Sequence, residues 1–178
     1  MFGQYRDKTR ILVMGTALEP LVLHVLNFHG TEFDVVSKTP ADPSHNDFSI
    51  LGTDDLDLAA VFQPNIALLA TGVPSALLKR IVGGGVLIYP ENSTERLHSL
   101  HGLSNYFRKI PYSAATCVRE GKSTVWETDM GRLPLPFTDP QVTKQLEGIK
   151  ILCQQLGIME EPFYEALMNF YGAENTIP

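Results

Sequence analysis

The stretch Arg10-Ile11-Leu12-Val13-Met14-Gly15 sets the interpretation of this 178-residue sequence. A short apolar run that ends at a glycine predicts a buried strand followed by a tight turn. Apolar residues at helical spacing follow over 18–29, and Gly30 is well placed to end that helix. A strand, a turn and a helix in this order are typical of the first repeat of a parallel α/β sheet.

The same alternation continues to residue 100. We expect strands at 33–36, 48–51, 65–70 and 86–89. Helices are expected at 54–62, 75–82 and 93–100. The segment Asn65-Ile66-Ala67-Leu68-Leu69-Ala70 is apolar almost throughout, which is typical of a parallel strand covered on both faces. The sequence therefore predicts the α/β class, with a doubly wound and mostly parallel sheet.

The rest of the chain has a different pattern. Short strands are expected there at 108–112, 115–119, 124–127 and 132–137. Glu120-Gly121-Lys122-Ser123 fits a hairpin turn, so we interpret these strands as a small antiparallel extension of the sheet. Apolar spacing then predicts one long helix over 142–156 and a last helix over 163–170. Because no linker or repeat interrupts the chain, residues 1–178 are expected to form a single domain.

Charge and composition argue against several classes of function. The net charge is −6 and the Lys and Arg residues are scattered, which disfavours nucleic acids and anionic membrane surfaces as partners. Neither a signal-like segment nor an apolar run of about 18 residues is present, so a cytoplasmic protein is expected. Its two cysteines, Cys117 and Cys153, form no C-x-x-C pair, and Cys153 is expected to be a buried thiol.

The turn after the first strand is where a sheet of this kind binds ligands. A phosphate-binding loop needs converging glycines and a lysine, but Gly15-Thr16-Ala17-Leu18-Glu19-Pro20-Leu21 has one glycine and no lysine. Thr16 and Glu19 also fit a capping box, in which each side chain binds the amide of the other. We therefore favour a self-satisfied helix start, with a surviving phosphate site as the alternative.

The other candidate groups have ordinary structural explanations. Asp54, Asp55 and Asp57 are expected to form the charged first turn of a helix, and a weak Mg²⁺ site is the alternative. His98 and His101 can share a helix face, but no further ligand stands beside them. We assign no catalytic residue and no metal site, and we take Asp54, Asp55 and Thr71 as the candidate polar groups of the crevice.

Six segments follow one another in the order known from one family, starting with Ile11-Leu12-Val13-Met14-Gly15-Thr16 and ending with Phe163-Tyr164-Glu165-Ala166-Leu167-Met168-Asn169-Phe170-Tyr171-Gly172-Ala173. The segments between them are 24–34, 62–69, 83–89 and 133–137. Together they resemble the middle, ATP-binding domain of the Mur ligases, in particular the murein-peptide-recycling branch. The resemblance implies a P-loop-NTPase-like topology, without the family's N- and C-terminal domains. It also implies ATP, Mg²⁺ and the joining of an amino acid or peptide to a UDP-muramyl carboxylate through an acyl phosphate.

Set against that family, the nucleotide loop has lost its chemistry. The family's G-T-H-G-K-T-T is matched here only by Gly15 and Thr16. Glu19 replaces the lysine that would hold the phosphates, and Pro20 replaces the threonine that would face Mg²⁺. We therefore treat Gly15, Thr16 and Glu19 as a vestigial nucleotide loop.

Three further parts of the family's site also have no match. Leu51 stands at the position of a metal-binding glutamate, and the D-H loop is deleted after Ala70. Pro140-Gln141 replaces the adenine-contacting His-Asn pair. The resemblance therefore implies a degenerate domain that uses neither ATP nor Mg²⁺ and serves as a binding or interaction module for an unknown protein partner or for a second copy of itself. Its status as an enzyme stays open, with no catalysis favoured. The alternative is a nucleotide-binding or UDP-muramyl-peptide ligase-related enzyme of cell-wall metabolism with a remodelled site.

Overall fold

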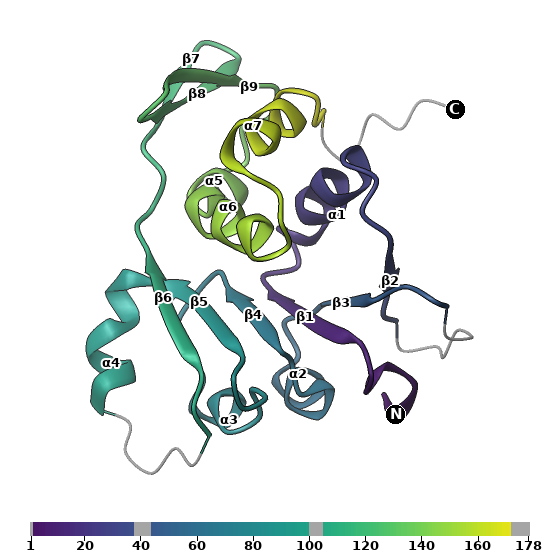
Figure 1. Cartoon of the computed structure of the whole chain (residues 1–178). Helices are drawn as coiled ribbons and strands as arrows, with labels where there is room; N and C mark the ends of the chain where they lie inside the picture. The colour runs from purple at the N-terminus through teal and green to yellow at the C-terminus, as the bar shows by residue number, and fades with distance from the viewer. Residues whose placement is uncertain (1, 38–43, 100–104, 172–178) are drawn as a thin grey trace. The chain divides into compact units, whose positions relative to one another are not determined.

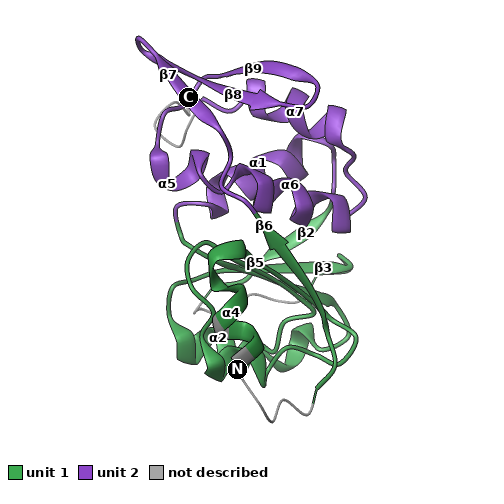
Figure 2. Ribbon diagram, turned by 90° about the vertical axis from the view of Figure 1, so that its left-hand side faces the viewer, with its two compact units in different colours: residues 1–16, 32–112 green, residues 17–31, 113–178 purple. Residues whose placement is uncertain are grey.

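The computed structural model describes residues 2–37, 44–99 and 105–171 (Figure 1). The chain forms two compact units, which are coloured green and purple in Figure 2. The first unit contains residues 1–16 and 32–112, and the second contains residues 17–31 and 113–178. The vestigial loop is divided between them, because Gly15 and Thr16 belong to the first unit and Glu19 to the second.

The first unit is built on a six-stranded sheet in which all neighbouring strands within the described residues are parallel. The order is β2-β3-β1-β4-β5-β6. Its strands are β1 (Thr9–Met14), β2 (Phe33–Val35), β3 (Phe48–Gly52), β4 (Ile66–Leu69), β5 (Val86–Pro90) and β6 (Arg108–Tyr112). This confirms the predicted α/β class with its parallel sheet. Because β1 lies between β3 and β4, the carboxyl ends of these three strands meet at one edge.

Short helices cover one face of this sheet, as Figure 1 shows. They are η1 (Gly3–Tyr5), α2 (Leu56–Phe62), α3 (Ser75–Leu78), η2 (Glu91–Ser93) and α4 (Thr94–Ser99). The main core of the unit lies between these helices and the sheet, and its fully buried members include Leu12, Leu69, Leu78 and Leu87. The helix α3 ends at Leu78, four residues before the predicted end at residue 82.

The second unit combines helices with a separate antiparallel sheet. Its elements are α1 (Glu19–Phe28), β7 (Cys117–Glu120), β8 (Ser123–Thr128), β9 (Gly131–Leu135), α5 (Pro140–Thr143), α6 (Leu146–Gln155) and α7 (Glu160–Met168). Helix α1 packs against α6 and α7. The Nε2 atoms of His24 and His29 on α1 lie 3.0 and 2.8 Å from the carbonyl oxygens of Ala166 and Pro162 on α7, so both imidazoles have structural partners.

Trp126 anchors the core of the second unit. Its side chain is fully buried and meets the rings of Phe163 and Tyr164 edge-on, at centroid distances of 6.5 and 5.4 Å. Lys150 lies over the Trp126 ring at 5.4 Å and pairs with Glu160 at 3.1 Å. Trp126 therefore has a packing role.

Two details of the predicted antiparallel region are wrong. The segment 108–112 is β6, which extends the main sheet in parallel by pairing with β5. The strands β7, β8 and β9 form their own three-stranded sheet rather than an extension of the parallel one. The predicted turn at 120–123 is confirmed, because Glu120 pairs with Ser123 and Gly121 adopts a positive φ of 62°.

The long helix predicted over 142–156 is also wrong, because the chain forms two helices there. Asp139 caps α5 by accepting a hydrogen bond from the Gln141 amide. The amide of Gln145 then bonds the carbonyl of Val142, three residues back, which tightens the chain and ends α5. Apolar spacing continues across this break, so periodicity alone does not reveal it.

The structure tests the expectation that Cys153 is a buried thiol. Cys153 is fully buried, as predicted, and burial raises the pKa of its thiol to about 12. Burial and the nearby Glu147 carboxylate raise the pKa of Cys117 to about 11.

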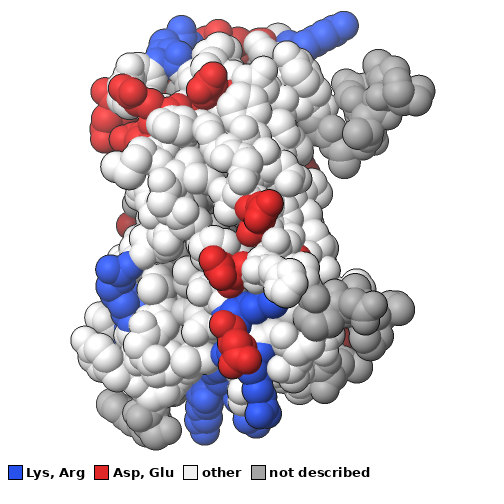
Figure 3. All heavy atoms as spheres, turned by 45° about the vertical axis from the view of Figure 1, so that its right-hand side comes forward, with Lys and Arg blue, Asp and Glu red and all other residues white. Residues whose placement is uncertain are grey.

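On the face seen in Figure 3, Lys and Arg side chains of the described residues form no continuous stripe. None of the helices described is long and apolar enough to cross a membrane.

Candidate functional site

The carboxyl ends of β1 and β3 bring Thr16 and Asp54 together. The amide of Thr53 donates to the carbonyl of Val13 at 3.0 Å, which continues the pairing of the two strands beyond their ends. Asp54 then accepts two hydrogen bonds at Oδ2, from the Thr16 amide at 3.2 Å and from the Thr16 hydroxyl at 2.8 Å. Gly15 permits the turn between strand and loop with a φ of 125°. The loop amide of Thr16 therefore points at a carboxylate of the protein itself.

The capping box predicted between Thr16 and Glu19 is wrong. Helix α1 starts at Glu19, with Leu18 at its N-cap and no side-chain hydrogen bond to that end among the described residues. The Thr16 hydroxyl is two residues too early for the N-cap, and Asp54 is its acceptor instead. Pro20 is in the first turn of α1, where its missing N–H costs little. Glu19 remains in that turn as a negative charge at a helix start.

Asp55 has a structural role at the start of α2. Its Oδ1 atom accepts hydrogen bonds from the amides of Asp57 at 3.0 Å and Leu58 at 3.1 Å, which makes it the N-cap residue. The hydroxyl of Thr53 in turn accepts a bond from the Asp55 amide at 3.0 Å. The interpretation of this acidic cluster as a helix start is therefore confirmed for Asp55 and Asp57, whereas Asp54 precedes the helix and binds Thr16. No group of three or more potential metal-binding side chains occurs among the residues that the structure describes, and His101 lies outside them.

A wide hollow of about 500 Å³ lies at this edge, and we call it the carboxyl-edge hollow. It is lined by Met14, Asp54, Leu56 and residues 71–74. The amide of Ala70 donates to the carbonyl of Met14 at 2.8 Å, which brings the exposed Thr71 to the rim beside β1. Two of the three predicted crevice residues, Asp54 and Thr71, thus line one hollow, whereas Asp55 is turned to its own helix.

Tyr112 supports the floor of this edge from the end of β6. It is 4% exposed, and its hydroxyl donates to the carbonyl of Leu69 at 2.7 Å. Burial raises the pKa of Tyr112, so the hydroxyl stays protonated and remains a donor. Nothing local in the sequence indicates this bond, because it depends on the approach of the ends of β4 and β6.

The chemistry available in the carboxyl-edge hollow is limited. Its lining residues include one carboxylate, Asp54, and one hydroxyl, Thr71, but no Lys, Arg or His. Binding sites for phosphate need backbone amides and cations that face the ligand. Here the Thr16 amide is engaged, and the charge inside the hollow is negative. The hollow is therefore suited to small polar or cationic groups rather than to phosphates.

Comparisons with known proteins give similarity of structure without similarity of sequence. No protein-family profile and no curated protein matches the sequence. The solved structure of MurF from Acinetobacter baumannii is similar, with a TM-score of 0.69 and 13% identity over 96% of this chain and 47% of that chain. A second similar structure is the UDP-N-acetylmuramate:L-alanyl-gamma-D-glutamyl-meso-diaminopimelate ligase (MPL) from Neisseria meningitides. Its TM-score is 0.67, with 13% identity over 94% of this chain and 67% of that chain.

The chain spans about half the length of MurF. Ligases of two branches match almost equally well, so the murein-peptide-recycling branch stays a prediction. At this level of identity the likeness concerns the fold alone. The chain therefore has an α/β fold like that of the central domain of the Mur ligases.

Proposed function

We propose that this chain is a degenerate Mur-ligase-like domain that carries out no ATP-dependent ligation and acts as a binding or interaction module. The fold supports the relation to cell-wall ligases. The carboxyl-edge hollow supports the loss of catalysis, because the groups that would neutralise a nucleotide's phosphates are missing from its lining.

The observation that carries this proposal is the pair of hydrogen bonds from Thr16 to Asp54. A phosphate at this loop would have to displace the Asp54 carboxylate from the Thr16 amide. The negative charge of the Asp54 carboxylate would also repel the phosphate. Two like charges about 4 Å apart repel by about 4 kcal/mol near a protein surface. At the sequence position where the family has its lysine, this chain has Glu19.

We extend the proposal to the cofactors, the cellular compartment and the partners of the domain. The domain uses neither ATP nor Mg²⁺, and it works in the cytoplasm, where its free Cys117 and Cys153 would stay reduced. Its partner is another protein or a second copy of the chain. Sedimentation velocity over a wide concentration range tests the second possibility, since self-association would raise the sedimentation coefficient with concentration. A monomer at every concentration would remove self-association from the proposal.

A second function is favoured by the open space of the carboxyl-edge hollow. About 500 Å³ is enough for a small ligand, and the exposed Asp54 and Thr71 offer it a carboxylate and a hydroxyl. In this alternative the hollow is a remodelled enzyme or nucleotide site of cell-wall metabolism. Its chemistry would then depend on Asp54.

A ligation assay separates the two functions. The protein is incubated with UDP-N-acetylmuramate, L-alanyl-γ-D-glutamyl-meso-diaminopimelate and MgATP, and phosphate release and the ligated product are measured. The ligase from Neisseria meningitides serves as the positive control. We expect neither phosphate nor product above the level without protein. Product from the wild type that disappears in Asp54→Ala would overturn the proposal and establish the alternative.

A further inference from the structure

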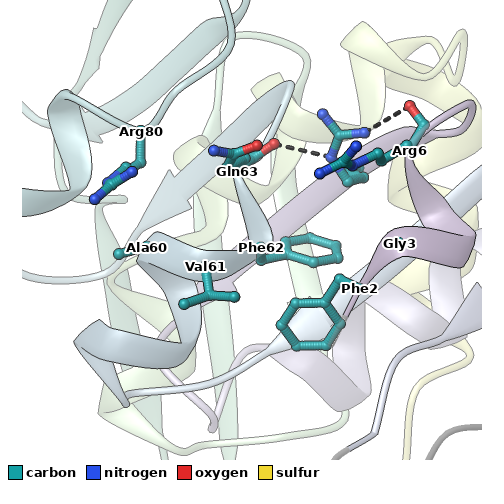
Figure 4. A pocket seen from close by; sticks show the side chains of 9 residues that line it. Phe2, Gly3, Arg6, Ala60, Val61, Phe62, Gln63 and Arg80 are labelled. Atoms are coloured by element: carbon teal, nitrogen blue, oxygen red, sulfur yellow. Dashed lines mark hydrogen bonds between the residues drawn. The ribbon is translucent and has the colours of Figure 1, made fainter.

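A second cavity of about 370 Å³ lies in the first unit at the opposite edge of the sheet. It is formed by η1, the start of β1 and the ends of α2 and α3, close to where β1 and β4 begin. Three arginines line it, together with an apolar wall, as Figure 4 shows. We call it the arginine pocket, and the residues that define it here are Arg6, Arg10, Arg80, Phe2, Val61 and Phe62.

Arg10 is the fixed element of the arginine pocket. Its side chain comes from the second residue of β1, and the residue is 8% exposed. The Nε atom donates to the Gln63 carbonyl at 2.9 Å, and Nη1 donates to the carbonyls of Arg6 at 2.7 Å and Tyr5 at 3.2 Å. Dashed lines in Figure 4 mark the bonds to Gln63 and Arg6. These bonds hold the guanidinium in one orientation and leave Nη2 without an acceptor among the described residues.

The positive charge of the arginine pocket is not balanced within it. No Asp or Glu belongs to its lining, and neither Arg6 nor Arg80 forms an ion pair with any residue that the structure describes. Burial, and then the neighbouring Arg6 charge, lower the pKa of Arg10.

The apolar wall gives the arginine pocket a second chemical character. Phe2 is 7% exposed and packs edge-on against Phe62, with ring centroids 5.3 Å apart. Val61, in contrast, is 57% exposed although it lines the cavity. One fixed cation, two exposed cations and the exposed side chain of Val61 match a ligand that carries both an anionic and an apolar group.

We propose that the arginine pocket binds an organic oxyanion, a phosphate or carboxylate group attached to an apolar body. The Nη2 amino group of Arg10, which has no acceptor among the described residues, remains to donate to an oxygen of such a group. Arg6 and Arg80 add charge at the rim, and Phe2, Val61 and Phe62 contact the apolar part. A purely structural role explains the three bonds of Arg10 but not the gathering of two further unpaired arginines around the same cavity.

Titration of the whole chain with two probes tests this proposal. Phenyl phosphate and 3-phenylpropionate are added separately, and binding is followed by calorimetry and by the backbone amide signals in two-dimensional NMR. We expect saturable binding of at least one probe, with shifts at the amides of Arg6, Gln63 and Arg80. Binding weakens as salt is added, because the rim charges are exposed. The two probes show whether the site accepts a phosphate, a carboxylate or both.

Variants at the rim avoid the risk that Arg10 substitutions unfold the protein. The double variant Arg6→Ala/Arg80→Ala is expected to weaken binding about tenfold or more, since two charge-assisted contacts are lost. Lys79→Ala is the matched control, because Lys79 is exposed and adjacent to Arg80 but does not line the cavity. We expect the control to bind as the wild type does.

Three results would overturn the proposal. The first is that neither probe binds saturably at concentrations up to about 10 mM, the range of very weak ligands. The second is that the double variant binds as tightly as Lys79→Ala. The third is that benzyl alcohol, which has the ring without the anion, binds as tightly as phenyl phosphate. These outcomes are independent of ATP binding, because the amide shifts distinguish the arginine pocket from the carboxyl-edge hollow.

Discussion

The two edges of the parallel sheet in the first unit have opposite chemistry. At the carboxyl edge, where folds of this type bind their ligands, the hollow contains Asp54 and no cation. At the amino edge, the arginine pocket contains three arginines and no carboxylate. The same parallel strands end at both edges. The side chains at each edge, and not the backbone, therefore determine which edge attracts anions.

At each edge a charged side chain of the protein binds backbone groups. The carboxyl edge holds its loop with an internal carboxylate, since Asp54 binds Thr16 in the place of an external anion. The amino edge holds its turns with a buried cation, since Arg10 binds three backbone carbonyls. A carboxylate thus holds the loop at the carboxyl edge, and a guanidinium holds the turns at the amino edge.

The largest effect is expected from Arg10→Ala. This change removes three charge-assisted hydrogen bonds and leaves buried carbonyls without their donor, so we expect a loss of about 3 kcal/mol in the free energy of unfolding. Urea denaturation measures it, with Arg80→Ala as an exposed control expected to change stability by less than about 0.5 kcal/mol. Equal stabilities of the two variants would contradict a structural role for Arg10 at the amino edge.

An ion pair at the same edge gives the next largest effect. Lys8 and Asp34 are 2.6 Å apart, with side chains 10% and 14% exposed, and Ser44 and Asn46 also donate to Asp34. Burial alone would raise the pKa of Asp34, but these donors outweigh it and leave the pKa lowered. We expect Asp34→Asn to cost about 1–2 kcal/mol at neutral pH, because Lys8 loses its partner in a largely buried position.

The pH dependence of this loss follows from the sign of the shift. A carboxyl group with a lowered pKa in the folded state stabilises the protein above its unfolded pKa of about 3.9. That contribution disappears as the pH falls through the lower, folded value. Thermal unfolding from neutral to acidic pH should therefore show the wild type and Asp34→Asn converging below about pH 4. A constant difference down to the lowest pH would contradict this assignment.

Smaller effects are expected at the carboxyl edge, where the groups are exposed. Asp55→Ala removes the N-cap of α2 and should cost about 1 kcal/mol. Asp54→Ala removes the acceptor of two exposed bonds and should cost about 0.5 kcal/mol. Comparison of the two variants by urea denaturation uses adjacent aspartates as controls for each other. A much larger loss in Asp54→Ala would mean that the Thr16 contact is a principal support of the loop.

The smallest expected effect is that of Glu19→Lys on nucleotide binding. The change restores the charge that the family has in its loop, but Asp54 still occupies the Thr16 amide and the hollow still lacks cations. We therefore expect no ATP-dependent rise in melting temperature for this variant. A clear rise would mean that a single charge reversal was enough to disable the site.

Local patterns in the sequence were enough to predict most of the fold. The apolar runs of β1 and β4 and the turn at Gly121 follow from hydrophobicity and glycine placement. The break between α5 and α6 did not, because it depends on how the Asp139 cap and the Gln145 amide end one helix without changing its apolar spacing. Nor did the parallel pairing of β6, which is decided by a neighbour about twenty residues away.

The candidate site was less predictable for the same reason. The loss of the lysine and the acid at Glu19 can be read directly from the sequence. The partner of Thr16 cannot, because a nearby glutamate and a distant aspartate both fit its hydroxyl and only the pairing of β1 with β3 decides between them. The arginine pocket was missed altogether, since Arg80 is far from Arg6 and Arg10 in the sequence and joins them only through the fold.

Calorimetric titration of the wild-type chain with MgATP tests the central claim most directly, with a Mur ligase of known ATP dependence as the positive control. The claim is that the carboxyl edge no longer holds a nucleotide. We predict heats equal to those of dilution at ATP concentrations up to about 1 mM, with and without Mg²⁺. A saturable, Mg²⁺-dependent heat of binding would contradict the claim, provided that ATP also shifts the NMR signals of the Gly15, Thr16 and Asp54 amides.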